Sequence, residues 1–176
     1  MTIDPRARLA LKTLFVVLSC SRLILFSSDV SAAAGNPTQP AFQNVLTNAQ
    51  FLTDLNTDRL AAGQTPLRLN GQLEQAAQAK VEDMISNNYW DHFRPVDHKA
   101  PWNFIDESGY GYRVAGENLA RGFRTEEGIT NAWMQSPTHR ANMLSPKYQE
   151  VGFATAYSYQ ADGSRILLTV EMFGSK

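Results

Sequence analysis

Three short segments of the chain contain the side chains best suited to chemistry. Their candidate residues are His92 in segment 89–92, Glu117 and Asn118 in segment 115–120, and His139 in segment 133–140. The chain has only 3 histidines in 176 residues, and two of them fall in these segments. Because neutral imidazole is both a base and a common metal ligand, these residues are candidates for proton transfer or metal binding.

Local context suggests a role for each histidine. His92 lies among aromatic residues just past a predicted helix, where a loop could place its ring in a cleft; a packed or capping histidine is the alternative. His139 follows Ser136 by three residues, near the start of a short predicted helix whose dipole disfavours imidazolium. It is therefore either a neutral ligand or base, or a residue used only for capping and packing. His98 lies next to Asp97 in a polar stretch and is not expected to contribute to the site.

Glu117 lies between the apolar residues Val114 and Leu119, so its carboxylate is either buried or exposed in a turn. A buried carboxylate needs partners. A histidine is an obvious one, because a carboxylate orients the imidazole and fixes which ring nitrogen is free. The candidates are too far apart in sequence to form a local metal motif of the His-Glu-x-x-His type. There is also no phosphate-binding glycine loop and no nucleophile elbow.

Residues 1–34 are typical of a secretory signal. Basic residues precede the apolar runs 14–18 and 23–26, and Ser31-Ala32-Ala33-Ala34 provides a cleavage site. A retained membrane anchor is the alternative, although neither run approaches the roughly 20 residues of a membrane span. Lipidation of Cys20, the only cysteine, is a second alternative. A processed chain would have no disulfide.

Residues 35–40 contain two prolines and are predicted to be a linker, followed by one domain over residues 41–176. The whole chain has a formal charge of -1, which becomes -3 without residues 1–34. Because lysine and arginine do not cluster after the leader, binding to nucleic acid is excluded as an expected function. We expect a secreted or cell-envelope protein with no integral membrane domain after processing.

Apolar periodicity predicts the elements of the domain. Helices are expected over 41–62, over 71–87 after an Asn70 cap, and over 126–135 and 137–144, with strands over 151–157 and 165–173 joined by a tight turn at Asp162-Gly163. The positions expected to face inward are Leu73, Ala76, Ala77, Val81 and Met84 in helix 71–87, and Ile129, Ala132 and Trp133 in helix 126–135. A short helix from Pro101 to Gly109 should direct Trp102 and Ile105 inward, and the rest of 89–116 is expected to be ordered loop. This pattern predicts an α+β fold, a three-layer α-β-α sandwich with a mainly antiparallel sheet.

Glu171 is an acidic residue in the otherwise apolar last strand, on one face with Thr169 and Phe173. It is either a functional interior group or a solvated strand position.

In order along the chain, several segments resemble the CAP superfamily (cysteine-rich secretory, antigen 5 and pathogenesis-related-1 proteins), specifically its bacterial secreted SCP-like branch. They include Asp91-His92, Pro101-Trp102, Gly116-Glu117-Asn118-Leu119-Ala120, His139-Arg140-Ala141-Asn142-Met143-Leu144 and Phe173-Gly174. The resemblance covers about residues 49–174 and implies an α-β-α sandwich.

The resemblance also implies a cleft with two histidines and two glutamates, in which the histidines can bind zinc or another divalent metal. His92 resembles the first histidine, Glu117 one glutamate and His139 the second histidine. Gln135 and Ser136 stand where the remaining glutamate is expected, and neither is a carboxylate.

We therefore predict an exported CAP-type binding or interaction domain with a metal-capable cleft, whose ligand is an unidentified extracellular or envelope component, a lipid among the candidates. The alternatives are a metal-dependent hydrolase or protease, in which Glu117 acts as base on water bound to a His92/His139 metal, and a structural envelope module. The sequence leaves open whether the protein is an enzyme.

Overall fold

The computed structural model describes residues 46–176. The predicted leader, the linker and the first residues of the predicted helix over 41–62 lie outside this range. In chain order the elements are α1 (Asn48–Ala61), β1 (Arg68–Leu69), α2 (Gly71–Ser86), α3 (Pro101–Glu107), β2 (Val114–Arg121), α4 (Glu126–Gln135), α5 (Pro137–Met143), β3 (Glu150–Tyr159) and β4 (Arg165–Ser175). No helix within residues 46–176 is long and apolar enough to cross a membrane.

The four strands form one sheet in the order β1-β3-β4-β2. Only the two-residue strand β1 runs parallel to its neighbour, β3, while β3 with β4 and β4 with β2 are antiparallel. Strand β2 pairs with β4 along its whole length and has no strand on its other side within the described residues. It is therefore one of the two edges of the sheet.

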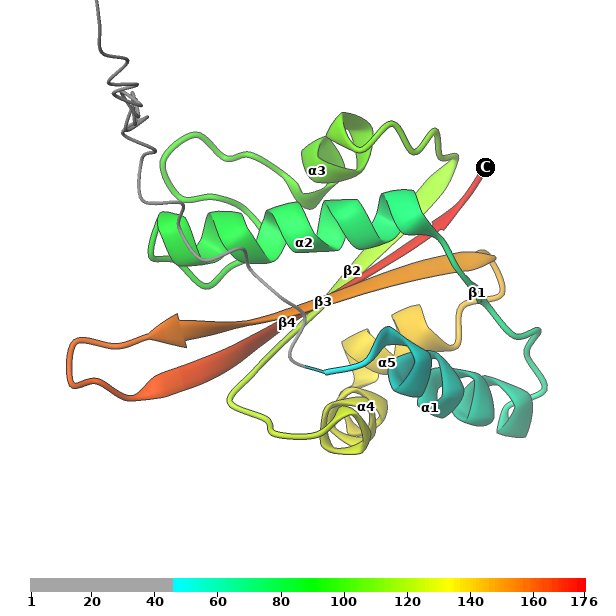
Figure 1. Cartoon of the computed structure of the whole chain (residues 1–176). Coiled ribbons are helices and arrows are strands. Elements are labelled where there is room, and N and C mark those ends of the chain that lie inside the picture. The colour runs from blue at the N-terminus through cyan, green and yellow to red at the C-terminus, as the bar shows by residue number, and fades with distance from the viewer. Residues whose placement is uncertain (1–45) are drawn as a thin grey trace, which may run out of the picture. The chain divides into compact units, whose positions relative to one another are not determined.

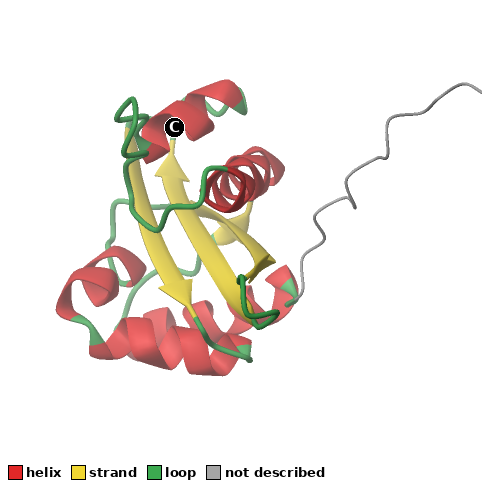
Figure 2. Ribbon diagram, turned by 90° about the vertical axis from the view of Figure 1, so that its left-hand side faces the viewer, coloured by secondary structure: helices red, strands yellow, loops and turns green. Residues whose placement is uncertain are grey.

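Helices cover both faces of this sheet (Figures 1 and 2), which confirms the predicted three-layer α+β sandwich. Helices α2 and α3 pack on one face, over Leu168, Val170 and Met172 of β4. Helices α1, α4 and α5 pack on the opposite face, over Phe173 of β4 and Phe153 of β3. Two apolar clusters thus lie on either side of the sheet.

Helix α2 matches its prediction closely. The Asn70 side chain accepts hydrogen bonds from the backbone N–H groups of Gln72 and Leu73, as an N-cap does. The predicted inward residues are all buried, namely Leu73, Ala76, Ala77, Val81 and Met84. One charged side chain, Lys80, is fully buried with them.

Helix α1 ends as predicted before Gly63, which adopts φ 71°, but its buried face includes one charged residue and leaves one apolar residue exposed. Leu60 is 61% exposed, whereas Phe51, Leu55 and Arg59 are buried at a spacing of four residues. A prediction based on apolar periodicity missed Arg59 because its guanidinium is buried through hydrogen bonds to backbone carbonyls rather than by apolar contact.

The segment between α2 and α4 gives two corrections. Ile105 of α3 is buried as predicted, but Trp102 is 37% exposed, so the prediction that it points inward is wrong. Residues from Val114 to Gly116, expected to be loop, begin the eight-residue strand β2. Helices α4 and α5 and the β3–β4 hairpin, with its turn at Asp162-Gly163, are found where they were expected.

Candidate functional site

His92 and Glu117 form the closest contact of the site. His92 follows α2 in a loop, and its Nδ1 lies 2.6 Å from Oε1 of Glu117 on β2. The His92 side chain is 47% exposed and that of Glu117 only 1%. The carboxylate therefore lies behind the imidazole, and the ring is the part that solvent can reach.

Successive residues of β2 point to opposite faces of the sheet. Leu119 belongs to the apolar cluster under α2, and Ala120 belongs to the cluster under α1, α4 and α5. Glu117 therefore faces the layer of α2 and α3, and Asn118 faces the layer of α1, α4 and α5. Asn118, expected to line the cleft, is fully buried. Its side-chain amide donates to Oε2 of Glu171 at 2.9 Å and to the backbone carbonyl of His139 at 3.3 Å.

His139 belongs to α5, on the face of the sheet opposite α2. Its Nδ1 lies 2.9 Å from Oγ of Ser136, the residue at the N-cap position. One turn further on, Asn142 donates to the backbone carbonyl of Glu117 at 3.1 Å and to Oδ1 of Asn118 at 2.9 Å. The structure thus joins His92 and Glu117 directly, and it connects His139 to them through the two asparagines around the edge strand β2.

Burial and hydrogen bonding change the pKa values of all three groups. The hydrogen bond to Glu117 raises the pKa of His92, and burial raises the pKa of Glu117 against the opposing effects of His92 and of the Lys80 ammonium. Both changes favour a proton between the two side chains. The pKa of His139 is lowered by burial and by the charge of a protonated His92, and both effects favour the neutral ring.

Two atoms of the site have no hydrogen-bond partner among residues 46–176 although they are buried. They are Oε2 of Glu117 and Oε1 of Glu171. Glu171 is fully buried, so the alternative of a solvated strand position is wrong. Residues 46–176 contain no group of three or more histidine, cysteine, aspartate or glutamate side chains arranged to hold a metal ion.

A pocket of about 230 Å³ adjoins His92 and Glu117. Three aromatic residues line it, Phe93, Trp102 and Tyr148. The rest of the lining is Pro101, Ala115, Gly116 and Asn142. His98 is exposed and does not line this pocket. The pocket therefore combines apolar rings with the polar groups of the site.

Sequence reasoning missed the side chains that cap the open edge of β2. Three successive outward carbonyls accept hydrogen bonds from side chains: that of Ala115 from Tyr148 at 3.2 Å, that of Glu117 from Asn142 at 3.1 Å, and that of Leu119 from Trp133 at 3.0 Å. The proximity of Asn142 to the site could have been predicted, because it follows His139 by three residues and so lies on the same face of the helix as His139. Nothing in the sequence around Tyr148 indicates its role.

Comparison with known proteins identifies the family of this chain. The family model described as the cysteine-rich secretory protein family, CAP, matches residues 52–172. The chain belongs to the CAP family. It is 35% identical over 126 residues to YkwD of Bacillus subtilis strain 168, an alignment that covers 71% of this chain and 49% of YkwD. The chain thus spans about half the length of that relative.

Two solved structures of bacterial proteins share the fold. An outer surface protein of Borrelia burgdorferi superposes with a TM-score of 0.63 at 19% identity, covering 77% of this chain and 98% of the Borrelia protein. An extracellular protein of Bacillus anthracis that contains an SCP domain gives 0.59 at 23% identity, covering 73% of this chain and 40% of that one. At these identities the likeness concerns the CAP fold alone.

Proposed function

We propose that this CAP domain is an exported binding module whose cleft binds a divalent cation such as zinc through His92 and His139. The observation that carries the proposal is the 2.6 Å contact between Nδ1 of His92 and the buried carboxylate of Glu117. Histidines that bind metals commonly use the second ring nitrogen to contact a carboxylate, which fixes the orientation of the ring.

The donor set fits such an ion in two further respects. Nδ1 of His139 also has a partner, Ser136, so that Nε2 of both histidines is without a hydrogen-bond partner among residues 46–176. Oε2 of Glu117 is buried and also lacks a partner in the described part of the chain. Two histidine ligands leave coordination positions for water or for a ligand, and they predict modest affinity.

The ligand of the module is proposed to be an extracellular or envelope component that occupies the aromatic pocket beside His92. The pocket offers ring faces from Phe93 and Trp102 next to polar groups, a combination that suits an amphipathic molecule, lipids included. Export is supported by residues 1–34, which resemble a leader, and by the structural relatives, of which one is an outer surface protein and another an extracellular protein.

A metal-dependent hydrolase is the alternative function for such a cleft, and one specific observation favours it. Oε2 of Glu117 is buried beside His92 and has no hydrogen-bond partner among residues 46–176, so the carboxylate has an unused proton acceptor. When bound, a divalent metal would supply an activated water. Metal-dependent cleavage of peptides that is lost in Glu117→Gln would favour this function, whereas a small molecule or lipid retained by the purified protein would favour the binding module.

Calorimetric titration of zinc into the parent and three histidine variants tests the metal site. His92→Ala and His139→Ala should each abolish binding, and the control His98→Ala should bind as the parent does. If either of the first two variants binds zinc with the affinity of the parent, the shared site does not exist.

The same titration has a predicted pH dependence. Protons compete with the metal for imidazole, so affinity should fall as the pH is lowered. An ordinary histidine has a pKa near ~6.5. Because the pKa of His92 is raised, the loss of zinc affinity should begin at a higher pH than it would for such a histidine. In Glu117→Gln the fall should move to lower pH, while affinity at high pH should weaken through lost orientation of the ring. A midpoint that does not move in this variant would contradict the role given to Glu117.

A further inference from the structure

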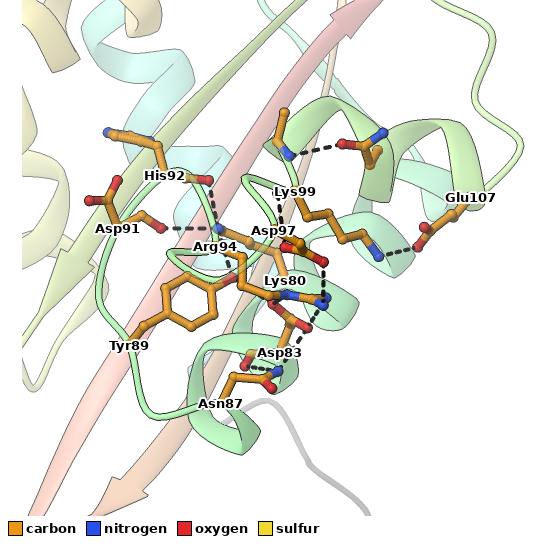
Figure 3. A network of polar contacts seen from close by, with 12 residues as sticks. Lys80, Asp83, Asn87, Tyr89, Asp91, His92, Arg94, Asp97, Lys99 and Glu107 are labelled. Atoms are coloured by element: carbon orange, nitrogen blue, oxygen red, sulfur yellow. Dashed lines mark hydrogen bonds and ion pairs between the residues drawn. The ribbon is translucent and has the colours of Figure 1, made fainter.

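Lys80 is a fully buried lysine whose charged end is directed at the loop that contains His92. Its Nζ donates to Oη of Tyr89 at 3.1 Å, to the carbonyl of Asp91 at 3.0 Å and to the carbonyl of His92 at 2.7 Å (Figure 3). An ammonium group has three N–H donors, so all of them are used. No carboxylate within residues 46–176 lies within ion-pair distance of this nitrogen.

The loop depends on these hydrogen bonds because it has few others. In the described part of the chain, residues 90–93 make no backbone-to-backbone hydrogen bond. Among residues 46–176, the only other hydrogen bond to the backbone of residues 90–93 is local, from the N–H of Phe93 to the side chain of Asp91 at 3.2 Å. The carbonyls of Asp91 and His92 therefore have Lys80 as their hydrogen-bond donor.

The two ends of the loop are attached separately, through Asp83. Tyr89 donates to Oδ2 of Asp83 at 2.6 Å, and Arg94 forms an ion pair with Asp83 at 2.5 Å and another with Asp97 at 3.1 Å (Figure 3). Asp83 follows Lys80 by three residues on α2, so both residues lie on the same helix face. Asp83 thus fixes the ends of the loop, while Lys80 fixes its middle, where the histidine is.

We propose that Lys80 is a positioning residue of the site, which holds the backbone of His92 so that the imidazole meets Glu117 and directs Nε2 outward. Its role is distinct from that of a ligand, because its side chain contacts the backbone of His92 and is inaccessible to solvent. The consequence for metal affinity rests on the proposed function, whereas the consequence for the contact between His92 and Glu117 does not.

The test compares Lys80→Met with Lys99→Met. Methionine replaces the buried stem of Lys80 with an apolar chain but removes its donors. Lys99 is a matched control because its Nζ also lies over the Phe104 ring, at 4.1 Å compared with 5.5 Å for Lys80. Its side chain forms an ion pair with Glu107, and only its backbone carbonyl, which the substitution leaves in place, bonds to the loop, at the N–H of Arg94. Denaturant unfolding checks that both variants fold.

The deciding measurement is a long-range ¹H–¹⁵N spectrum of the histidine rings in the metal-free protein, at a pH where they are neutral. The parent and Lys99→Met should show His92 with its proton on Nδ1, facing Glu117. Lys80→Met should lose this preference, while the signals of His98 and His139 stay in place. Retention of the Nδ1 proton on His92 in folded Lys80→Met would overturn the proposal.

Zinc titration forms the second arm. Affinity should fall by about 10-fold or more in Lys80→Met, within the range found for residues that orient metal ligands, and should not change in Lys99→Met. If the parent protein binds no zinc, the proposed function is contradicted. The role of Lys80 is then tested by the histidine spectrum alone. Should Lys80→Met not fold, Lys80→Gln replaces it: its amide nitrogen falls one bond short of the ammonium position, so the same loss is expected, and a retained Nδ1 proton would again overturn the proposal.

Discussion

Two buried glutamates on the paired strands β2 and β4 differ in their partners and therefore in their chemistry. Glu117 is paired with a half-exposed histidine, whereas Glu171 is fully buried and receives a hydrogen bond only from Asn118 among the described residues. Burial raises the pKa of Glu171 to about 8, with smaller opposing effects from Asn118 and Arg59. The folded protein therefore favours the protonated form of Glu171 at pH values where the carboxyl group ionises in the unfolded chain.

The raised pKa of Glu171 predicts that the free energy of unfolding depends on pH. Between its ordinary value of 4.5 and about 8, the unfolded chain releases the proton while the folded protein keeps it, so stability falls as the pH rises through this window. Glu171→Gln removes the titration. Denaturant unfolding at several pH values should therefore show the variant gaining stability relative to the parent as the pH increases from 4.5 to 8.

Glu150 is the matched control, since its pKa shifts in the opposite direction. Hydrogen bonds from Tyr110 and Asn70 lower its pKa. The folded protein then favours the ionised form, and this stabilisation is present above pH 4.5 and is lost as the pH falls through the lowered value. Glu150→Gln should lose stability relative to the parent above pH 4.5. Parallel curves for Glu171→Gln and the parent would show that Glu171 does not titrate in this window.

At the scale of elements, the close approach of α2 to β3 depends on one glycine. A Cβ on Gly152 would clash with the backbone of Leu73 and Glu74 at the start of α2, where no flexible side chain can move aside. Gly152→Ala should therefore reduce the free energy of unfolding by about 3 kcal/mol or more, the upper part of the cost of overpacking. Gly111→Ala is the control, because a Cβ there meets no atom within 4 Å. Equal stability of the two variants would disprove the close approach.

Trp133 of helix α4 contacts strand β2 directly. This residue is 2% exposed, its ring centroid lies 6.4 Å from that of Phe51, and its indole N–H donates to the carbonyl of Leu119. The prediction from sequence that it faces inward is confirmed. Trp133→Ala should cost about 3 to 5 kcal/mol in denaturant unfolding. A loss below about 1 kcal/mol would show that the packing of α4 does not depend on this side chain.

The elements also show why sequence predicts some parts of the molecule and not others. Helix α2 was predictable because its cap, Asn70, and its apolar period are encoded locally. Strand β2 was not, because Gly116, Glu117 and Asn118 have poor strand propensity and are extended only through pairing with β4. The three site residues could be named from a resemblance to a family, but the contact of His92 with Glu117 depends on how that strand is placed.

At the scale of the whole molecule, the sequence predicts that the protein is exported. The residues on which this prediction rests lie outside the described range, 46–176. The basic, apolar and alanine-rich order of residues 1–34 predicts cleavage near Gly35. Mass spectrometry of the secreted or envelope fraction should find a mature N-terminus there. An intact Met1 on protein recovered from the soluble cytoplasm would contradict this prediction.

The side chains along β2 also have a consequence for solubility. An edge strand with free carbonyls is a template for a strand of another molecule, and such pairing leads to aggregation. Here Tyr148, Asn142 and Trp133 occupy the outward carbonyls of Ala115, Glu117 and Leu119. The residues that bring α5 and His139 to the site thereby block strand addition at the same edge, so the geometry of the cleft and resistance to self-association depend on the same hydrogen bonds.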